Sequence, residues 1–557
     1  MQEIRIGVFV CNCGSNIAGF LNCTDIAEYS KSLPHVVFTR ENLFSCSEAG
    51  VSDIKKAIIE NKLNRVVVAA CTPRTHEPTF RAACQEAGMN PFQFEFVNIR
   101  EHCSWAHKNE RDLATTKAKD LIRMGVARAA LLEPQVSIVA NVEPSALVIG
   151  GGIAGMTAAK SLADRGFHVT LVERAPELGG MIRRLNKILP GEIDAETMIQ
   201  EKMNAVRGNK NISVLTRHTV SDIAGYVGNY MATIRDSGGG EQKKKVGIII
   251  LATGAQVLTP DGLYNYNGST IISQLELESK LKSGKIKADT VVMIQCVGSR
   301  NRDRVYCSRI CCMTSIKNAI LLKQQRPSRR VFILYRDLMC YGVENEDLLR
   351  RAKALGVRFI KFSEHQPPKI DGLTVTVFND VLGREMEVPA DLIALATPFI
   401  PSDGVEDISK MLKVPLDEYK FFLEAHIKLR PLDFATDGIY VCGTAHWPAS
   451  TAESIFQALG AAARASIHLT RREVEVEPIV SMLVDEDICR GCGLCASVCP
   501  YGAIEMIQTA KGIKANIVAV ACKGCGTCGA TCYTHAIRMN HFTDEQLLAQ
   551  IETAFRE

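Results

Sequence analysis

Hydrophobic and polar positions follow two rhythms over roughly the first 132 residues. Short β-branched runs predict strands, and apolar residues recurring every three or four positions predict helices. The predicted strands cover residues 4–10, 35–39, 65–70 and 92–99, and the predicted helices cover 25–33, 51–61 and 77–87, with a long helix after Glu101. This alternation is typical of a parallel sheet covered by helices.

The remaining pattern divides the chain further. A Pro-punctuated join at residues 134–144 leads into a second α/β region that runs to about residue 470, and a charged linker follows at 471–477. The last stretch contains a cysteine repeat whose first members, Cys489 and Cys522, are 33 residues apart. We therefore predict an α/β protein of three domains, covering residues 1–140, 141–472 and 473–557, a number that suits 557 residues.

Composition excludes several classes of protein. Hydrophobic residues make up 46% and charged residues 23%, as in an ordinary globular protein. Lys and Arg number 65 against 61 acidic residues, so nucleic acid is not an expected partner. The N-terminus lacks the features of a signal peptide, and no apolar stretch approaches the roughly 18 residues that span a bilayer. We expect a cytoplasmic location with reduced thiols, so the 21 cysteines need another explanation than disulfides.

The C-terminal repeat has the spacing of a bacterial ferredoxin. Each half reads C-x2-C-x2-C-x3-C, and in that arrangement the fourth cysteine of one run binds the cluster of the other. One predicted [4Fe-4S] set is therefore Cys489, Cys492, Cys495 and Cys532, and the other is Cys522, Cys525, Cys528 and Cys499. A structural zinc site is the alternative, but zinc modules normally separate their two C-x2-C knuckles by a longer loop. The repeat favours two clusters that move single electrons.

A dinucleotide-binding fingerprint follows the predicted strand at 145–149. The run Gly150-Gly151-Gly152-Ile153-Ala154-Gly155 opens a helix, and Glu173 ends the next strand, where an acidic residue binds a ribose hydroxyl. A Gly-rich turn without a ligand is the alternative, and the strand and helix on either side argue against it. Later motifs, 178–180, 251–254 and 438–443 with the helix around Gln457, resemble those of two-dinucleotide-domain flavoproteins of the thioredoxin reductase type. In that family the last strand usually ends in Gly-Asp, and Thr444 stands where the Asp would be.

Those flavoproteins carry a second Gly-rich loop for NAD(P)H, and this chain does not. After the equivalent strand at 290–294 the sequence reads Gln295-Cys296-Val297-Gly298-Ser299-Arg300, without the three-glycine fingerprint. Four cysteines gather in this region, and we interpret them as a cluster-binding set in place of the nicotinamide site: Cys296, Cys307, Cys311 and Cys312. Four buried cysteines acting as small hydrophobic residues are the alternative.

Cysteines also follow the strands of the N-terminal sheet. Functional groups collect beyond the carboxyl ends of parallel strands. We expect a further cluster from the strand-end cysteines, with one of the first two left over: Cys11, Cys13, Cys46, Cys71 and Cys103. Buried positions facing helices are the alternative, and Cys23 and Cys84 fit that description. Counting all sets, the sequence predicts about four [4Fe-4S] clusters.

Taken together, the motifs resemble the A-type subunit of heterodisulfide reductases, its flavin and iron–sulfur component, over essentially the whole chain. The matching stretches are 10–14, 70–77, 98–105, 295–300, 306–309, 311–312 and 442–448. Longer members of that family carry an additional ferredoxin domain within the flavin domain, and residues 220–246 are too short to hold it. The chain therefore resembles the short form.

The resemblance implies a cytoplasmic complex in which FAD performs electron bifurcation. Electron pairs come from a hydrogenase, formate dehydrogenase or NADH-oxidising module; one electron goes to ferredoxin and the other towards B- and C-type subunits of heterodisulfide reductase, which reduce a disulfide. A homodimer within the complex is expected, and Lys317 is placed at the flavin N5 edge as a catalytic residue. The implied FAD contacts are Gly150, Gly152, Ile153, Ala154, Gly155, Glu173, Arg174, Gly179, Gly180, Thr253, Gly254, Lys317, Gly443, Thr444, Ala445, Gln457 and Ala458.

Two other functions remain open from sequence. One is a plain flavin-dependent oxidoreductase that accepts NAD(P)H directly, against which the missing second Gly-rich loop argues. The other is a passive electron-relay component of a sulfur-oxidising or aromatic-ring-reducing complex, in which the flavin only converts electron pairs to single electrons. The sequence does not separate relay from bifurcation or name the terminal acceptor.

Overall fold

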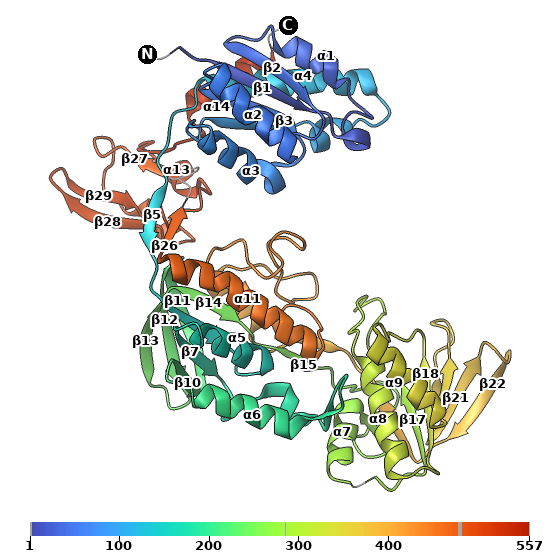
Figure 1. Ribbon diagram of the computed structural model, residues 1–557. Helices are drawn as coiled ribbons and strands as arrows, with labels where there is room; N and C mark the ends of the chain where they lie inside the picture. Colours follow the sequence, from blue (N-terminus) through green and yellow to red (C-terminus); the bar gives the residue numbers. More distant parts are fainter. Residues whose placement is uncertain (1–2, 285, 477–481, 556–557) are drawn as a thin grey trace. The chain divides into compact units, whose positions relative to one another are not determined.

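The computed structural model describes residues 3–284, 286–476 and 482–555, and its chain divides into two units (Figure 1). Unit 1 joins residues 1–139 to residues 475–557, and unit 2 comprises residues 140–474. Short strands, β5 (Ile138–Asn141) and β26 (Glu473–Val476), lie where the chain passes from one unit to the other. The predicted linker at 471–477 is thus part helix end and part strand, and Glu477 lies outside the described residues.

The first part of unit 1 is the predicted parallel sheet. Its four strands run in the order β2-β1-β3-β4, with all neighbours parallel. Residues 66–70 are buried throughout because helices cover both faces of such a sheet. The strands are β1 (Ile6–Cys11), β2 (Val36–Asn42), β3 (Arg65–Ala70) and β4 (Phe94–Asn98), and the helices are α1 (Cys23–Ser30), α2 (Glu48–Glu60), α3 (Pro73–Glu86) and α4 (Arg111–Ala130).

One detail of this sheet was not anticipated. The chain after β4 first forms a π-helical turn, η2 (Arg100–Ser104), and the long helix α4 begins only at Arg111. A π-helical turn shifts the direction of its side chains relative to an α-helix, and such turns are frequent at functional sites. Cys103 lies within this turn.

The C-terminal part of unit 1 has the two-fold repeat that the cysteines predict. Two short helices, α12 (Leu494–Val498) and α13 (Thr527–Thr531), each begin after a glycine with positive φ, Gly493 and Gly526. The last helix, α14 (Asp544–Ala554), packs on α4 of the parallel sheet. The strands pair as two antiparallel ladders, β27 (Met482–Val484) with β30 (Ile537–Met539), and β28 (Ile504–Thr509) with β29 (Gly512–Ile517).

Unit 2 contains two parallel five-stranded sheets. The first runs in the order β10-β7-β6-β14-β25, and α11 (Thr451–Arg471) lies along α5 (Ile153–Ala163) against it (Figure 1). Its strands are β6 (Ser145–Ile149), β7 (His168–Glu173), β10 (Ile212–Thr216), β14 (Ile248–Leu251) and β25 (Ile439–Val441), with α6 (Ala195–Arg207) packed on α5.

The second sheet of unit 2 runs in the order β16-β23-β17-β18-β19. Its strands are β16 (Ile271–Ser273), β17 (Thr290–Ile294), β18 (Arg330–Tyr335), β19 (Arg358–Lys361) and β23 (Leu392–Leu395), and its helices are α7 (Gln274–Lys282), α8 (Cys311–Gln325) and α9 (Val343–Ala354). The antiparallel pair of β15 (Ala255–Val257) and β24 (Phe399–Pro401) connects the two halves.

Three-stranded antiparallel sheets complete each half of unit 2. One consists of β11 (His218–Tyr226), β12 (Asn229–Asp236) and β13 (Glu241–Val246), and the other of β20 (Lys369–Asp371), β21 (Thr374–Asn379) and β22 (Arg384–Pro389). The first occupies residues 218–246, so this stretch is a sheet with short turns. The smaller elements are η1 (Gly14–Asn16), η3 (Gly180–Arg184), β8 (Lys187–Ile188), β9 (Ile193–Asp194), α10 (Val405–Leu412) and η4 (Gly443–Ala445).

Candidate functional site

The glycine fingerprint forms the turn between strand β6 and helix α5. A Cβ on Gly155 would lie 1.8 Å from the carbonyl oxygen of Gly150, so this position must be glycine for α5 to approach the strand. Gly150 has φ of +110°, and its own Cβ would lie 2.2 Å from the carbonyl oxygen of Ala252. A Cβ on Gly152, in contrast, would meet open space. The turn is tightly packed on the protein side and open where a ligand would approach.

The other flavin motifs lie around this turn. The Gly179 N–H donates to the carbonyl of Gly151, and a Cβ on Gly180 would lie 3.2 Å from the Cα of Gly152. The buried Glu173 carboxylate accepts from the Gly151 N–H at 2.7 Å and from the Ala175 N–H at 2.7 Å. Arg174 is exposed and donates to the carbonyl of Asp403.

The end of β25 closes the same region. A Cβ on Gly443 would lie 2.8 Å from the Cβ of Ala154 at the start of α5, and the nearest atom to a Cβ on Gly254 is the Thr444 Oγ1. The Gly443 N–H donates to the Gln457 Oε1 at 3.1 Å, while Ala445 and Ala458 are buried beside them. These motifs therefore come together from four separate segments.

Unsatisfied polar atoms support a ligand here. The Thr253 Oγ1 is buried and has no hydrogen-bond partner among the described residues, and it directly precedes Gly254. Buried polar groups normally have a partner. The open side of Gly152 and this unpartnered hydroxyl fit a dinucleotide such as FAD.

The eight C-terminal cysteines surround two hollows. Cys489, Cys492, Cys495 and Cys532 line one, and Cys499, Cys522, Cys525 and Cys528 line the other. Each hollow thus receives three thiols from one half of the repeat and one from the other half. Four thiols around each cavity fit a [4Fe-4S] cluster, whose four irons each take one cysteine sulfur.

The four middle cysteines form one electrostatic group. Burial is the main cause that raises the pKa of Cys312, to about 12, and Cys296 and Cys307 raise it further. Burial also raises the pKa of Cys311, and the other three cysteines add to that shift. Burial also raises the pKa of Cys296, and Arg300 lowers it. Thiols whose pKa is raised by burial and by neighbouring thiols become thiolates more readily beside a cation, as they would around a cluster.

The backbone around these cysteines is unusual. Cys296 follows β17 with φ of +60°, and Arg309, between Cys307 and Cys311, has φ of +64°. Residues other than glycine adopt such angles mostly where the surrounding structure or function requires them. The Arg309 N–H donates to the Cys307 Sγ at 3.3 Å, and the Arg309 side chain pairs with Glu453 near the start of α11. This arginine links the cysteine segment to the helix that carries Gln457.

The N-terminal cysteines come together only in part. The Cys11 Sγ accepts from the Ser45 N–H at 3.4 Å, and Cys13 and Cys46 both raise its pKa after the larger effect of burial. Burial raises the pKa of Cys71 to about 11, Arg100 lowers it, and Cys11 and Cys46 raise it.

Cys103 lies in a different environment. Burial raises its pKa to about 11, and the charged groups that act on it are Lys117 and Asp120 of α4. The π-helical turn therefore places this thiol towards α4, whereas Cys11, Cys13, Cys46 and Cys71 act on one another. Cluster binding by these N-terminal cysteines stays a prediction.

Lys317 lies inside unit 2 rather than on a solvated helix face. Only 3% of the residue is exposed, its Nζ donates to the carbonyl of Lys187 at 2.9 Å, and it pairs with Glu278 of α7. Burial lowers its pKa, and Glu278 raises it. The lysine is on α8, the helix that begins with Cys311 and Cys312.

Sequence reasoning missed several residues of these sites. Cys340 is buried and raises the pKa of Cys312, but it belongs to no cysteine spacing motif. Glu278 is 39 positions from Lys317, and nothing in the local sequence connects them. His446 and Glu424, described below, were also not assigned a role.

Comparison with known proteins agrees with the site geometry. Residues 144–298 match the pyridine nucleotide-disulphide oxidoreductase family, and residues 482–505 match the 4Fe-4S binding domain family. An A-type iron-sulfur subunit of the CoB–CoM heterodisulfide reductase of Methanopyrus kandleri is 38% identical, over 100% of this chain and 99% of that protein. The chain belongs to the family of heterodisulfide reductase A-type subunits.

Other members of this family match over the same extent. The A-type subunit of the H2:CoB-CoM heterodisulfide,ferredoxin reductase of Methanothermobacter marburgensis is 36% identical, over 100% of this chain and 98% of that protein. The alignment runs over 652 positions, more than the 557 residues here, so this chain is a shorter member. Among solved structures, Lactococcus lactis thioredoxin reductase aligns with a TM-score of 0.44 and 18% identity, over 59% of this chain and 99% of that one.

The family assignment confirms the resemblance drawn from sequence, and the family models confirm an α/β protein with a pyridine nucleotide-disulphide oxidoreductase domain and a C-terminal 4Fe-4S domain. The protein is part of an oxidoreductase and has a flavin domain and an iron–sulfur domain. None of the helices that the structure describes has the length and apolar character needed to cross a membrane.

Proposed function

We propose that this chain is the electron-bifurcating component of a heterodisulfide-reductase-like complex. Electron pairs from a hydrogenase, formate dehydrogenase or NADH-oxidising partner reach FAD in unit 2, one electron passes to ferredoxin, and the other passes to B- and C-type subunits. In the reverse direction, FAD would take one electron from ferredoxin and one from the B- and C-type subunits and pass the pair to the input module. FAD exchanges electron pairs for single electrons, and [4Fe-4S] clusters carry single electrons.

The arrangement along α8 carries this proposal. The helix has two cysteines of the four-thiol group at its N-terminus and the buried Lys317 about 1.4 turns later. The four thiols stand where related flavoproteins have their NAD(P)H loop, so electrons would leave the flavin domain through a cluster instead of through a nicotinamide. An oxidoreductase that accepts electrons directly from NAD(P)H does not require a four-cysteine group at this position.

This chain's residues have separable tasks in the proposal. The glycine turn and Glu173 would bind the dinucleotide, and the buried Lys317, which is paired with Glu278, would act on the flavin ring as the resemblance implies. The eight cysteines of the C-terminal repeat hold two clusters and the middle cysteines a third, with a fourth at the N-terminal sheet.

Names of relatives support the partners. Members of the family are named for H2, formate or ferredoxin together with the CoB-CoM heterodisulfide, in Methanothermobacter marburgensis, Methanococcus maripaludis and Methanosarcina mazei. We extend such partners to this chain as a class: an electron-input module, ferredoxin, and B- and C-type subunits that reduce a disulfide. Assembly as a homodimer and a cytoplasmic location belong to the same proposal.

Anaerobic turnover of the purified complex tests the function. With donor and disulfide present, the wild-type complex is expected to reduce ferredoxin in step with the disulfide. Lys317→Ala, combined with Glu278→Gln so that no buried charge is left unpaired, is expected to keep FAD and clusters but to lose ferredoxin reduction while the disulfide branch persists. Lys323→Ala is the matched control, because Lys323 is on the same helix and donates to the carbonyls of Pro327 and Arg329.

One result would overturn this proposal, and a second would remove Lys317 from it. Disulfide reduction by the wild-type complex without any ferredoxin reduction would indicate a passive relay. Ferredoxin reduction at the wild-type ratio in the variant that combines Lys317→Ala with Glu278→Gln would remove the lysine from the mechanism.

A further inference from the structure

His446 occupies a confined position beside the proposed flavin contacts. It follows η4, is 2% exposed, and its ring lies 3.7 Å from that of Trp447, centroid to centroid. Its Nε2 lies 2.9 Å from the Glu424 Oε2, and its Nδ1 lies 3.3 Å from the Gln457 Oε1. Both ring nitrogens therefore face an oxygen of another side chain.

The orientation of the Gln457 amide is set by the backbone. The Gly443 N–H donates to the Gln457 side chain at 3.1 Å, and an N–H requires an acceptor, so the atom on this side is the amide oxygen. The same oxygen faces the His446 Nδ1. A neutral imidazole has only one N–H, so a neutral His446 can satisfy Glu424 or Gln457 but not both. Only the protonated ring donates to each.

Burial and the charges around the ring act on its pKa in opposite directions. Burial lowers the pKa of His446 below its ordinary 6.5, and Glu424 raises it, as does Asp417 to a smaller extent. Asp417 and Glu424 are the charged groups that act on this ring, and both come from the loop before β25. Near neutral pH the ring is thus mostly neutral, with its Nε2–H donated to Glu424 and its Nδ1 able to take one more proton.

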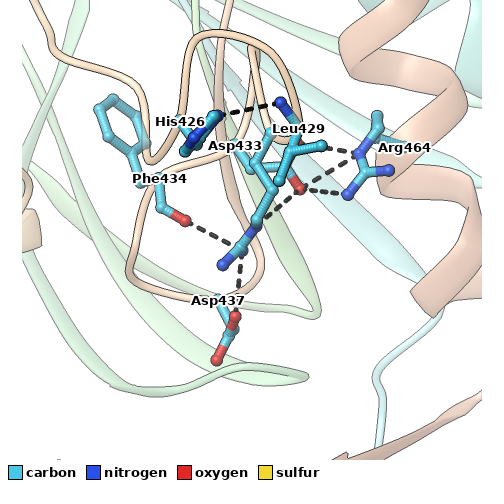
Figure 2. Close-up of polar contacts among 7 residues, drawn as sticks. His426, Leu429, Asp433, Phe434, Asp437 and Arg464 are labelled. Carbon is cyan, nitrogen blue, oxygen red and sulfur yellow. Dashed lines mark hydrogen bonds and ion pairs between the residues drawn. The ribbon is translucent and has the colours of Figure 1, made fainter. Parts of the chain in front are cut away.

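The loop that carries Glu424 is bonded to helix α11. Figure 2 shows how Asp433, farther along the loop, receives the Arg464 guanidinium of α11 at 2.8 and 2.9 Å. Arg430 adds a bond to the carbonyl of Phe434, and the Ala425 N–H donates to the carbonyl of Asp433. These bonds tie the loop that carries Glu424 to the helix that carries Gln457.

Gln457 connects the histidine to the proposed flavin site. Its amide oxygen serves Gly443 and His446, and no acceptor for its Nε2 hydrogens is found among the described residues. Those hydrogens remain available to an acceptor oxygen of a bound cofactor. A proton on His446 would then interact electrostatically with the bound flavin through the Gln457 amide.

We propose that His446 is a redox-linked proton site, which takes up one proton at Nδ1 when the bound FAD is reduced and releases it on oxidation. The inference rests on the proposed FAD site. Reduction adds two electrons from the reductant and one proton to the cofactor, a net charge of −1, and one further proton from solvent adds to the ring. No bond of the protein breaks, and the added negative charge on the cofactor is offset by the imidazolium.

The pH dependence of the flavin midpoint potential tests this. In dithionite titrations of the FAD-loaded chain, each extra proton bound per two electrons steepens the dependence by about 30 mV per pH unit. Between about pH 6 and 8, we expect the slope of midpoint potential against pH to be up to about 30 mV per pH unit smaller in His446→Gln than in the wild type. Glu424→Gln should lose a similar amount, because Glu424 raises the pKa of the ring.

His426→Asn is the matched control. His426 is in the same loop, and its Nδ1 accepts from the backbone N–H groups of Lys428 and Leu429 at 3.1 Å, a role that an asparagine oxygen can fill (Figure 2). This control should keep the wild-type slope.

The outcomes separate this inference from the proposed function. A wild-type slope in FAD-loaded His446→Gln would overturn it. If that variant does not fold, the same titration of Glu424→Gln tests the inference. A wild-type pH dependence of the midpoint potential in Glu424→Gln would also contradict it. Failure of the wild-type chain to bind FAD would instead contradict the proposed function.

Discussion

Lys317 of α8 and Glu278 of α7 form an ion pair in which both side chains are almost completely buried. The Glu278 Oε2 also accepts from the Asn186 N–H at 3.0 Å, and the Lys317 Nζ donates to the carbonyl of Lys187. The pair therefore joins two helices to residues 186–187, which follow the Gly179–Gly180 turn.

We predict that Lys317→Ala destabilises unit 2 by about 3–5 kcal/mol, because it leaves the Glu278 charge buried without a partner. Adding Glu278→Gln should recover part of this loss, since a neutral amide can still accept from Asn186. Urea unfolding followed by Trp447 fluorescence in a Trp105→Phe background measures it, because the chain has only these two tryptophans. Equal stability of the single and double variants would contradict the prediction.

Cofactor content should reflect the cysteine sets. Anaerobically purified chain is expected to contain one FAD and about four [4Fe-4S] clusters, from two sets in the C-terminal repeat, one in the middle and one at the N-terminal sheet. Iron, acid-labile sulfide and flavin analysis measure this directly. Stoichiometric zinc with little iron would contradict it.

The two C-terminal hollows predict which cysteine variants behave alike. Cys499→Ser should affect the same cluster as Cys525→Ser, because both residues line one hollow, although Cys499 is nearer in sequence to Cys492. Cys492→Ser should affect the other cluster. Low-temperature EPR of the reduced variants distinguishes the two clusters, and Cys442→Ala, a buried thiol outside every set, is the control. Matching spectra for Cys499→Ser and Cys492→Ser would refute the crossed arrangement.

Direct oxidation of NADH or NADPH should be slow. The turn after β17 has Cys296, with φ of +60°, where a pyrophosphate-binding turn needs glycine and open backbone, and a Cβ on Gly298 would lie 2.6 Å from Leu258. Stopped-flow bleaching of the isolated chain's flavin measures the rate, with dithionite as the positive control. Fast, saturable reduction by NADPH would restore the plain-oxidoreductase alternative.

His541 should make unit 1 less stable in acid. Burial, with Arg128 and Arg81, lowers its pKa from 6.5 to about 4. Between these values the unfolded chain binds a proton that the folded chain does not, so stability falls as the pH falls from about 6.5 to 4, by about 3 kcal/mol for this residue.

The comparison of His541→Gln with its parent isolates this effect. Trp105 fluorescence in a Trp447→Phe background reports urea unfolding of unit 1, and the acid-dependent part of the stability should shrink in the variant. The comparison is needed because burial raises the pKa of Glu95 to about 7, which acts in the opposite direction. An unchanged difference between pH 6.5 and 4 would show that His541 does not contribute.

Much of the site could be predicted from sequence because its chemistry is local. The glycines at 150–155 and the two C-x2-C-x2-C-x3-C runs each place their groups within one turn or loop, where spacing alone fixes geometry. The strands of the N-terminal sheet were predictable for the same reason, since residues 66–70 of β3 (Arg65–Ala70) form an uninterrupted apolar run.

Strand-end position alone was a weaker guide. Cys11 lies at the end of β1 and Cys71 follows the adjacent strand β3. Cys11 raises the pKa of Cys71, as expected for thiols at one edge of a parallel sheet. Cys103 follows β4 but lies in a π-helical turn facing α4. The direction of a side chain after a strand depends on the turn that follows, and no hydrophobic period records a π-helical turn.

The sequence by itself determined the family, the fold class and the cofactor types, because these depend on glycine and cysteine spacings within short segments. Only the tertiary structure decided that Lys317 pairs with Glu278 and that His446 lies between Glu424 and Gln457. The partners in these contacts come from different elements, and a single polar residue leaves no periodic signal. The packing of the elements determines which group such a residue pairs with and how deeply it is buried, and these two factors set its pKa.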